Sequence, residues 1–346
     1  MQQATGKRKG CETLMKTKRL NVRNIFDKYS IYLVLLIMLI FMGIISDDFF
    51  TTTNFINVLV AEAGRGLLVL GECYVIISKG IDLSVGSIVA LSSVTSASIV
   101  QDITYDSRIL QWMPEINPIL GAALAVVVGV VIGLLFGLFN GLLVAYTKTP
   151  PFIATLGSMV IAAGLALMYT DSFPVSMLSS EFKNIGQGKV GVIPYVVIVF
   201  IVIAVIAWVI LNKTRFGKSI YAIGGNESAA QYAGINVKKN TCLIYIWSGV
   251  LAGLAGVLIT ARSGSGIATL GDGYELDAIA AATVGGVSQT GGVGTIGGAV
   301  VGIFILGVLN NGLLLLGVSP YLQQVIKGLI IIGAVVVDMR KAMKNN

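Results

Sequence analysis

The chain has no histidine and few charged residues, which make up 12% of its 346 positions. Without histidine there is no Ser-His-Asp or Cys-His nucleophilic machinery and no His-ligated metal site. The three cysteines, Cys11, Cys73 and Cys242, lie far apart and form no CxxC pair. We therefore expect free thiols, with no disulfide framework and no zinc site. An ordinary soluble domain carries roughly 25% charged residues, so the composition also excludes a soluble globular enzyme.

Hydrophobic residues are abundant instead, at 55% of the chain. That content is enough for about nine or ten bilayer-spanning helices of ~20 residues each. It is far too high for an intrinsically disordered chain. The composition predicts an all-α polytopic membrane protein, with the lipid bilayer as its surroundings.

Basic residues are concentrated in three short polar regions. Residues 1–28, 212–240 and 338–346 hold sixteen of the 24 Lys and Arg residues but four of the 17 acidic residues. Lysine and arginine in short segments beside apolar helices mark the cytoplasmic side of a membrane protein. We therefore interpret 1–28 and 339–346 as cytoplasmic tails, and 29–338 as a transmembrane domain with a cytoplasmic segment at 212–240. The same distribution argues against nucleic acid as a partner.

Apolar runs separated by polar turns predict ten helices, with both termini on the cytoplasmic side. The expected ranges are 30–46, 55–77, 86–101, 119–146, 152–170, 195–211, 241–261, 276–290, 296–317 and 322–337. Loops 102–117 and 171–193 then lie outside the cell. The run 276–290 is short for a span, so it either crosses the membrane or re-enters it.

A short sequence repeat is consistent with this count. Asn140-Gly-Leu-Leu143 is followed by Pro151-Phe-Ile153, and Asn311-Gly-Leu-Leu314 is followed by Pro320-Tyr-Leu322. The two helices that carry the repeat are five apart and run in opposite directions. An inverted 5+5 repeat would give this relation, with the substrate path between the halves. Chance similarity of Leu- and Gly-rich segments is the alternative.

Two motifs resemble nucleotide sites without their context. Gly292 to Gly297 reads G-x-G-x-x-G, but no strand pattern precedes it and no acidic residue follows about 20 positions later. Close helix packing through small residues explains it better. Gly217-Lys-Ser219 resembles the end of a P-loop, whose first glycine would fall at Asn212. We expect no ATPase site and no cofactor in this chain; a partner subunit would bind ATP.

The polar segment 212–240 reads NKTRFGKSIYAIGGNESAAQYAGINVKKN. Asn226 can cap a short helix from Glu227 to about Ala233, and Gly234 can end it. Small residues such as Ala229 and Ala230 let a partner surface approach closely. We interpret this segment as a docking element; a solvated loop that only orients the protein is the alternative.

The residues Glu227 to Gly234 resemble the EAA-type coupling motif of permease subunits in bacterial ABC importers. Five further motifs, in the same order along the chain, resemble signatures of the monosaccharide branch of that family: GIDLSVG (80–86), PFIATLG (151–157), TRFGK (214–218), YELDAIAA (274–281) and GGVGT (291–295). Residues 212–218, 222–226 and 284–288 look most like galactose/methyl-galactoside permeases. Residues 309–313 suit ribose permeases as well.

The resemblance implies a homodimer of this chain in the bacterial cytoplasmic (inner) membrane. Its partners would be an ABC ATPase subunit, which binds ATP, and an extracytoplasmic sugar-binding protein. The residues implied in coupling to the ATPase are Arg215, Phe216, Gly217, Glu227, Ala229, Ala230 and Gly234. This chain would be a transport subunit and not an enzyme.

A sugar needs hydrogen-bond partners where water is scarce, and amides both donate and accept. Our candidates for the substrate path are Asn140, Asn310, Asn311, Gln323 and Gln324. Hydrogen bonding between helices is the alternative for each. Glu62 and Arg65, three apart on one helix face, suggest a structural ion pair. Lys327 lies within an apolar run and could snorkel or pair with an acid.

A second class of function remains open from the residues alone. An ion-coupled secondary sugar transporter would use intramembrane acids such as Glu62 and Glu72 as carriers. Such a transporter does not need a docking segment like 212–240. Within the ABC family, ribose or another pentose is the alternative substrate.

Overall fold

The computed structural model describes residues 22–345, in which almost all regular structure is helical. The long helices are α1 (Val22–Ile45), α2 (Thr52–Ile77), α4 (Pro118–Tyr146), α5 (Pro151–Thr170), α7 (Tyr195–Lys213), α10 (Val237–Ser263), α12 (Ile296–Leu315) and α13 (Pro320–Asn345). The shorter elements are α3 (Val85–Ile99), α6 (Ser180–Gln187), β1 (Lys189–Val190), β2 (Ile193–Pro194), α8 (Arg215–Gly225), α9 (Glu227–Tyr232) and α11 (Tyr274–Val284). The expected all-α class is confirmed. Most of the expected tail 1–28 lies outside the described residues.

Six helices are long and apolar enough to cross a membrane: α4, α5, α7, α10, α12 and α13. Two shorter apolar stretches, Ile31–Ile45 and Val85–Ile99, belong to α1 and α3. The protein is therefore a multi-pass membrane protein. A total of ten passes, an inverted repeat and the sidedness of the termini stay predictions.

Polar caps and prolines set where the apolar helices begin. The Asn117 side chain accepts hydrogen bonds from the backbone N–H groups of Ile119 and Leu120, and Pro118 occupies the first turn of α4. Proline suits that position because its missing N–H would have no partner inside the helix. Thr295 caps α12 in the same way through the Gly298 N–H. These local signals explain why α4 and α12 begin within one residue of their expected starts. Other boundaries differ: α1 begins at Val22 instead of 30, α11 ends at Val284 instead of 290, and α13 ends at Asn345 instead of 337.

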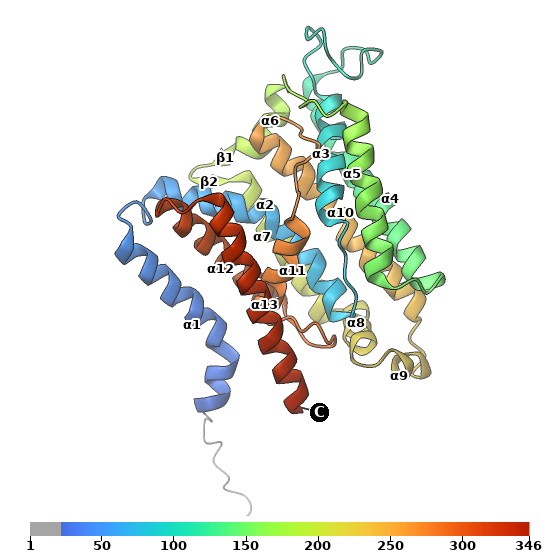
Figure 1. Cartoon of the computed structure of the whole chain (residues 1–346). Helices are drawn as coiled ribbons and strands as arrows, with labels where there is room; N and C mark the ends of the chain where they lie inside the picture. Colours follow the sequence, from blue (N-terminus) through green and yellow to red (C-terminus); the bar gives the residue numbers. More distant parts are fainter. Residues whose placement is uncertain (1–21, 346) are drawn as a thin grey trace, which may run out of the picture.

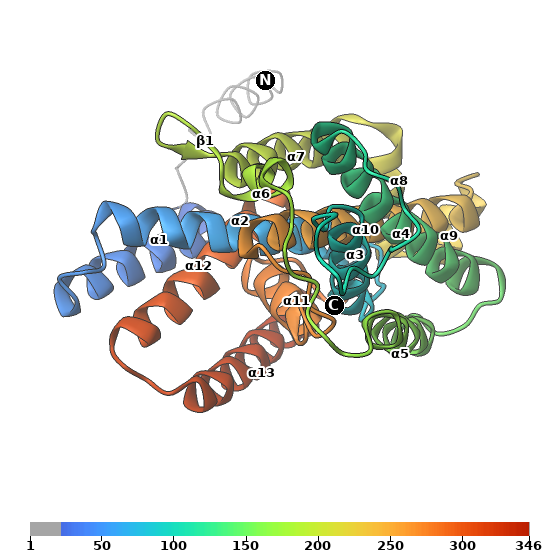
Figure 2. The same cartoon turned by 90° about the horizontal axis from the view of Figure 1, so that it is seen from above.

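Helices α2, α3 and α10 form the centre of the molecule (Figure 2). Every residue of α2 from Gly66 to Ile77 is buried, so this half of the helix is surrounded by protein on all sides. Helices α1, α12 and α13 stand on one flank, and α4 and α5 stand on the other (Figure 2). One end of the molecule carries α8, α9 and the C-terminal end of α13, and the opposite end carries α6 (Figure 1). We call these the α9 end and the α6 end.

Glycines bring α4 and α10 into backbone contact. Gly129, Gly133, Gly137 and Gly141 recur at every fourth position of α4, so they share one helix face. A Cβ atom on Gly133 would overlap the carbonyl oxygen of Gly249, and one on Gly253 would overlap that of Gly129. Small residues at this spacing allow the closest packing of two helices in a membrane.

Segment 171–193 differs from the expected plain loop. It contains α6 and the hairpin in which Lys189 pairs with Pro194 and Val190 with Ile193. The Ser179 hydroxyl accepts the Phe182 N–H and caps α6, and the Phe182 side chain is buried. Ser179 followed by Glu181 in the first turn is a signal for the start of a helix, and the prediction of a loop did not take it into account.

Candidate coupling site and transport path

The predicted short helix in the polar segment is confirmed as α9. The Asn226 side chain accepts the Ala229 N–H at 2.9 Å and caps its start. Its end has two closing hydrogen bonds, from Ile235 N–H to the Ala230 carbonyl and from Gly234 N–H to the Gln231 carbonyl, both 3.0 Å. Gly234 has φ +83°, a left-handed conformation that glycine adopts without strain. The sequence therefore fixes α9 at both ends.

The two alanines of α9 have different surroundings. Ala230 is 4% exposed, so it packs within its own chain, whereas Ala229 and Glu227 are exposed. Tyr232 is 92% exposed and is the large side chain that α9 presents outward. An exposed aromatic residue on a short helix is a typical anchor for a protein partner. The list of expected coupling residues did not include Tyr232.

The polar segment also contains α8, a helix for which the sequence analysis made no prediction. The Thr214 hydroxyl accepts the Gly217 N–H and caps this helix at its start. Arg215 is exposed, Phe216 is half-buried and packs against the core, and Gly217 is buried. A Cβ atom on Gly217 would overlap the Leu211 carbonyl oxygen, so glycine permits the tight turn from α7 into α8.

The far end of α8 is attached to the protein core by backbone contacts. A Cβ atom on Gly224 would overlap the carbonyl oxygen of Ile77, the last residue of α2. That oxygen accepts the Gly292 N–H at 2.8 Å. The Tyr221 hydroxyl donates to the Gly294 carbonyl at 2.8 Å, and burial raises the pKa of Tyr221 to about 12, so it remains a donor at neutral pH. Gly292 and Gly294 of the G-x-G-x-x-G stretch therefore contact α8 and the end of α2, consistent with their expected structural role.

Asn140 belongs to a buried polar network between α3, α4 and α5. Its amide donates to the Ser84 hydroxyl at 2.8 Å and its carbonyl accepts from Ser158. Ser84 in turn donates to Asp82 at 2.6 Å, and the second Asp82 oxygen accepts from Ser248 at 3.0 Å. Asp82 and Ser84 belong to GIDLSVG, and Ser158 directly follows PFIATLG. The Thr155 hydroxyl of PFIATLG donates to the Ile81 carbonyl of GIDLSVG at 3.3 Å, so the two motifs are in contact. Asn140 has no exposed surface, and its role on a substrate path stays a prediction.

The other candidate amides have separate surroundings. Asn311 exchanges two hydrogen bonds with Asn54 of α2, at 2.8 and 3.0 Å. The Gln323 amide donates to the Val318 carbonyl at 2.8 Å, and Gln324 is exposed. The Asn310 carbonyl oxygen is buried and has no hydrogen-bond partner among the described residues. These contacts do not join the amides into one site.

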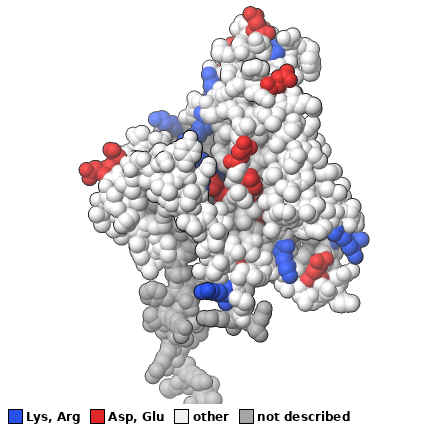
Figure 3. Space-filling view, viewed as in Figure 1, with Lys and Arg blue, Asp and Glu red and all other residues white. Residues whose placement is uncertain are grey.

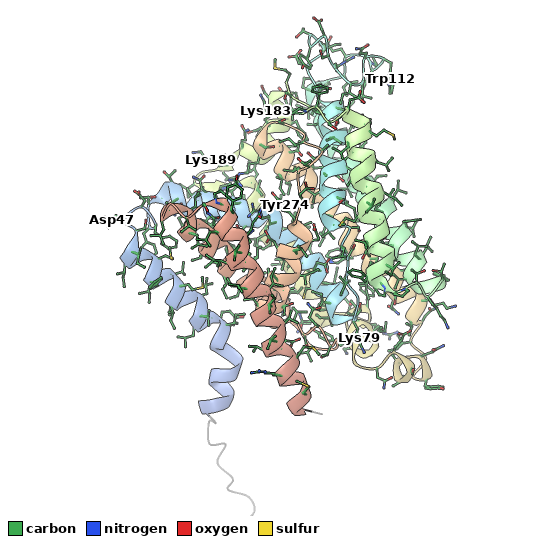
Figure 4. All side chains as sticks on the ribbon, viewed as in Figure 1. Asp47, Lys79, Trp112, Lys183, Lys189 and Tyr274 are labelled. Atoms are coloured by element: carbon green, nitrogen blue, oxygen red, sulfur yellow. The ribbon has the colours of Figure 1, made fainter. Side chains whose placement is uncertain are left out.

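Charged residues form a second cluster, on α2, α11 and α13. The expected Glu62–Arg65 ion pair is confirmed, with Oε1 and Nη1 3.3 Å apart. Lys327 pairs with Asp277, its Nζ lying 3.0 and 3.2 Å from the two carboxylate oxygens. The Arg65 guanidinium lies 5.0 Å from the centre of the Tyr274 ring. We call these five residues the central charged cluster; Tyr274 is labelled in Figure 4, and Figure 3 shows acidic side chains in the middle of the same face.

The first turns of the short helices α3 and α11 meet beside this cluster. A Cβ atom on Gly86, in the first turn of α3, would overlap the Glu275 carboxylate and the Gly271 carbonyl oxygen. Glu275 lies in the first turn of α11. Short or interrupted helices in the two halves of a transporter point to its binding site. The motifs GIDLSVG and YELDAIAA therefore come together in the interior, although they are far apart in sequence.

Membrane-length helices around a polar interior, with a capped exposed helix between two of them, define a multi-pass membrane permease. The family model described as branched-chain amino acid transport system / permease component matches residues 54–335, and the chain belongs to this family. Its members are transport components rather than enzymes.

Individual relatives are similar over nearly their whole length. The ribose import permease protein RbsC of Bacillus subtilis (strain 168) is 42% identical over 327 residues, 94% of this chain and 97% of its own. The galactose/methyl galactoside import permease protein MglC of Haemophilus influenzae is 41% identical over 331 residues, 93% and 96% of the two chains. The expected resemblance to sugar permeases of the ribose and galactose branch is confirmed. No solved structure matches the chain.

Proposed function

We propose that the chain is the membrane subunit of an ABC importer for a monosaccharide, with galactose or methyl galactoside as substrate and ribose as the alternative. The observation that carries this proposal is α9, a helix capped at both ends, exposed through Tyr232 and continuous with the anchored helix α8. Relatives named for ribose and for galactose are 42% and 41% identical, so overall identity does not separate the two sugars.

In this proposal an ABC ATPase binds the α9 end in the cytoplasm, and a sugar-binding protein docks at the α6 end. Movement of α9 reaches the core through the contacts of Gly224 with Ile77 and of Tyr221 with Gly294. The ATPase can drive this change only if it binds one conformation of the permease more tightly than the other. ATP is bound by that partner, and a second copy of this chain completes the transporter.

The central charged cluster supports a sugar path through the interior. Arg65 and Lys327 keep 31% and 27% of their side chains exposed although they lie within membrane-length helices. Charged side chains at this depth face a bundle interior or a water-filled cavity, since lipid does not solvate them. Their donors, together with the Tyr274 hydroxyl, suit the hydroxyl groups of a sugar.

We expect labelled galactose to enter proteoliposomes that contain this chain, its ATPase and its binding protein. Uptake should occur only when ATP is present on the side of the membrane where the ATPase lies. Labelled ribose is the matched competitor. Preferential uptake of ribose would replace the proposed sugar with the alternative. Uptake driven by an ion gradient without ATPase would instead support a secondary transporter. Glu72 would then be the candidate ion carrier, because it is fully buried and its carboxylate oxygens have no hydrogen-bond partner among the described residues.

The sidedness follows from the same proposal and is tested separately. Single cysteines replacing Asp106 and Val192, both exposed, should react fully with an impermeant thiol reagent applied to intact cells. A cysteine replacing Lys218 in α8 should react only after the cells are opened, because we place that segment in the cytoplasm. Cys11 is first changed to serine, and Cys73 and Cys242 are buried and contribute little background. Labelling of position 218 in intact cells would invert the proposed orientation.

A further inference from the structure

A cavity of about 880 Å³ lies at the α9 end. Its lining includes Gly224, Glu227 and Gly234 of the coupling segment but no residue of the central charged cluster. Its walls come from the turn after α2, the connection between α4 and α5, and the segment from α8 to the start of α10. It therefore lies between the coupling segment and the main helix bundle. Figure 4 places Lys79, one of its lining residues, at this end of the molecule.

Three lysines from different parts of the chain line the cavity: Lys79 after α2, Lys148 between α4 and α5, and Lys238 in the first turn of α10. Glu227 is the acidic residue of its lining. None of these lysines forms an ion pair in the part of the chain that is described, where the pairs are Glu62–Arg65 and Asp277–Lys327. Hydroxyl and amide side chains, including Thr149 and Asn236, add hydrogen-bonding groups. The cavity is therefore suited to an anion.

Two of these lysines have an unusual backbone. Lys79 has φ +67° and Lys148 has φ +58°, each directly after the last turn of a helix. The turn at Lys79 is closed by hydrogen bonds from its N–H to Ile76 and from the Gly80 N–H to Val75, both 2.8 Å. Helices that end in this way usually place glycine at the left-handed position, because a side chain is strained there. Strained residues cluster at ligand sites, so lysine instead of glycine at both positions favours a ligand-binding role for the two side chains.

The position of the cavity indicates where the anion comes from. Tyr146, Phe152 and Ile153, beside the α4–α5 connection, are about half exposed, and both helices are mostly apolar on their outer faces. Aromatic side chains at helix ends mark the level of the lipid headgroups. The Lys238 ammonium lies 5.6 Å from the centre of the Tyr146 ring, at the same level. Basic pockets between helix ends at this level bind anionic headgroups.

We propose that this cavity binds the phosphate of an anionic phospholipid headgroup, which holds the coupling segment against the α4–α5 connection. Binding of the lipid to the cavity does not depend on which sugar is transported. Only the effect of the lipid on coupling rests on the proposed function. Lipid binding is therefore measured without sugar or ATPase.

The test compares two triple variants with the same loss of charge. Lys79, Lys148 and Lys238 are changed to Gln in the cavity variant, and exposed Lys213, Lys218 and Lys239, which do not line the cavity, are changed in the control. Each full-length protein is placed in phosphatidylcholine nanodiscs with or without phosphatidylglycerol, and retained lipid is counted by native mass spectrometry. We expect wild type and control to retain phosphatidylglycerol, and the cavity variant to retain at least about tenfold less. Unchanged thermal unfolding shows that both variants are folded.

Three results would overturn the proposal. Equal loss in both triple variants would mean general attraction between lysine and the membrane. Binding of inorganic phosphate without retention of phosphatidylglycerol would assign the cavity to a free anion. Normal lipid retention in the cavity variant, with loss of ATPase co-purification, would show that the lysines bind acidic residues of the partner. Displacement of phosphatidylglycerol by millimolar phosphate would support recognition of the phosphate itself.

Discussion

Gly224→Ala is expected to abolish sugar uptake, although the protein should still insert in the membrane. A Cβ atom at this position would overlap the Ile77 carbonyl oxygen and lie 2.6 Å from the Gly292 nitrogen. Both are backbone atoms, so neither can move aside as a flexible side chain does. Relief requires α8 to leave the end of α2 and breaks the Gly292–Ile77 hydrogen bond. Overpacking of this kind costs about 1–3 kcal/mol in a well-packed core.

The neighbouring residue provides a matched control for this prediction. Gly225 is the last residue of α8, and a Cβ atom added there would have no other atom within 4 Å. Gly225→Ala should therefore leave uptake near the wild-type level. Uptake of labelled sugar and the amount of permease in membranes are measured for both variants. Normal uptake by Gly224→Ala at equal expression would show that the α8–α2 contact does not transmit coupling.

The second large effect is expected from Tyr232→Ala. Because this side chain is 92% exposed, its removal should change neither membrane insertion nor thermal unfolding of the isolated permease. An aromatic anchor in a partner's pocket typically contributes 2 kcal/mol or more, so ATPase affinity should fall by about thirtyfold. Co-purification with the ATPase, and ATPase binding to immobilised permease, measure the loss.

Tyr321 serves as the comparison for Tyr232. It is 82% exposed but lies at the start of α13, on a different part of the molecule. Tyr321→Ala removes an equally large side chain and should leave ATPase binding intact. If the two variants bind the ATPase equally well, α9 is not the docking helix. If both lose binding, the effect belongs to exposed aromatic surface in general.

The sequence predicted the features that local physical chemistry determines. Long apolar runs gave the membrane-length helices, and Asn226 with Gly234 gave both ends of α9, because caps act within a few residues. Helix α8 was missed, although Thr214 caps it, since its polar composition resembles that of a loop. The hairpin was missed because two-residue strands leave almost no alternation to detect.

The interior contacts could not be predicted in the same way. Lys327 was expected either to snorkel or to pair with an acid, and its partner Asp277 lies 50 positions away. Asn140 was recognised as unusual inside an apolar helix, but Ser84 and Ser158 are brought to it by the packing of α3 and α5. Pairings over such distances depend on the folded arrangement, and periodicity within one helix does not encode them.

The glycine contacts between α4 and α10 have a mechanical consequence. Carbonyl groups of each helix fit between the glycines of the other, so the two helices cannot slide past one another or roll without a steric clash. They form a single stiff rod, and at ~1.5 Å per residue α10 alone is about 40 Å long. Four residues separate α9 from the start of α10, and α10 ends at Ser263, where Gly186 of α6 approaches the backbone of Arg262. We therefore expect a displacement of the first turn of α10, which follows the turn at Gly234, to reach α6 as a rigid-body movement of this rod.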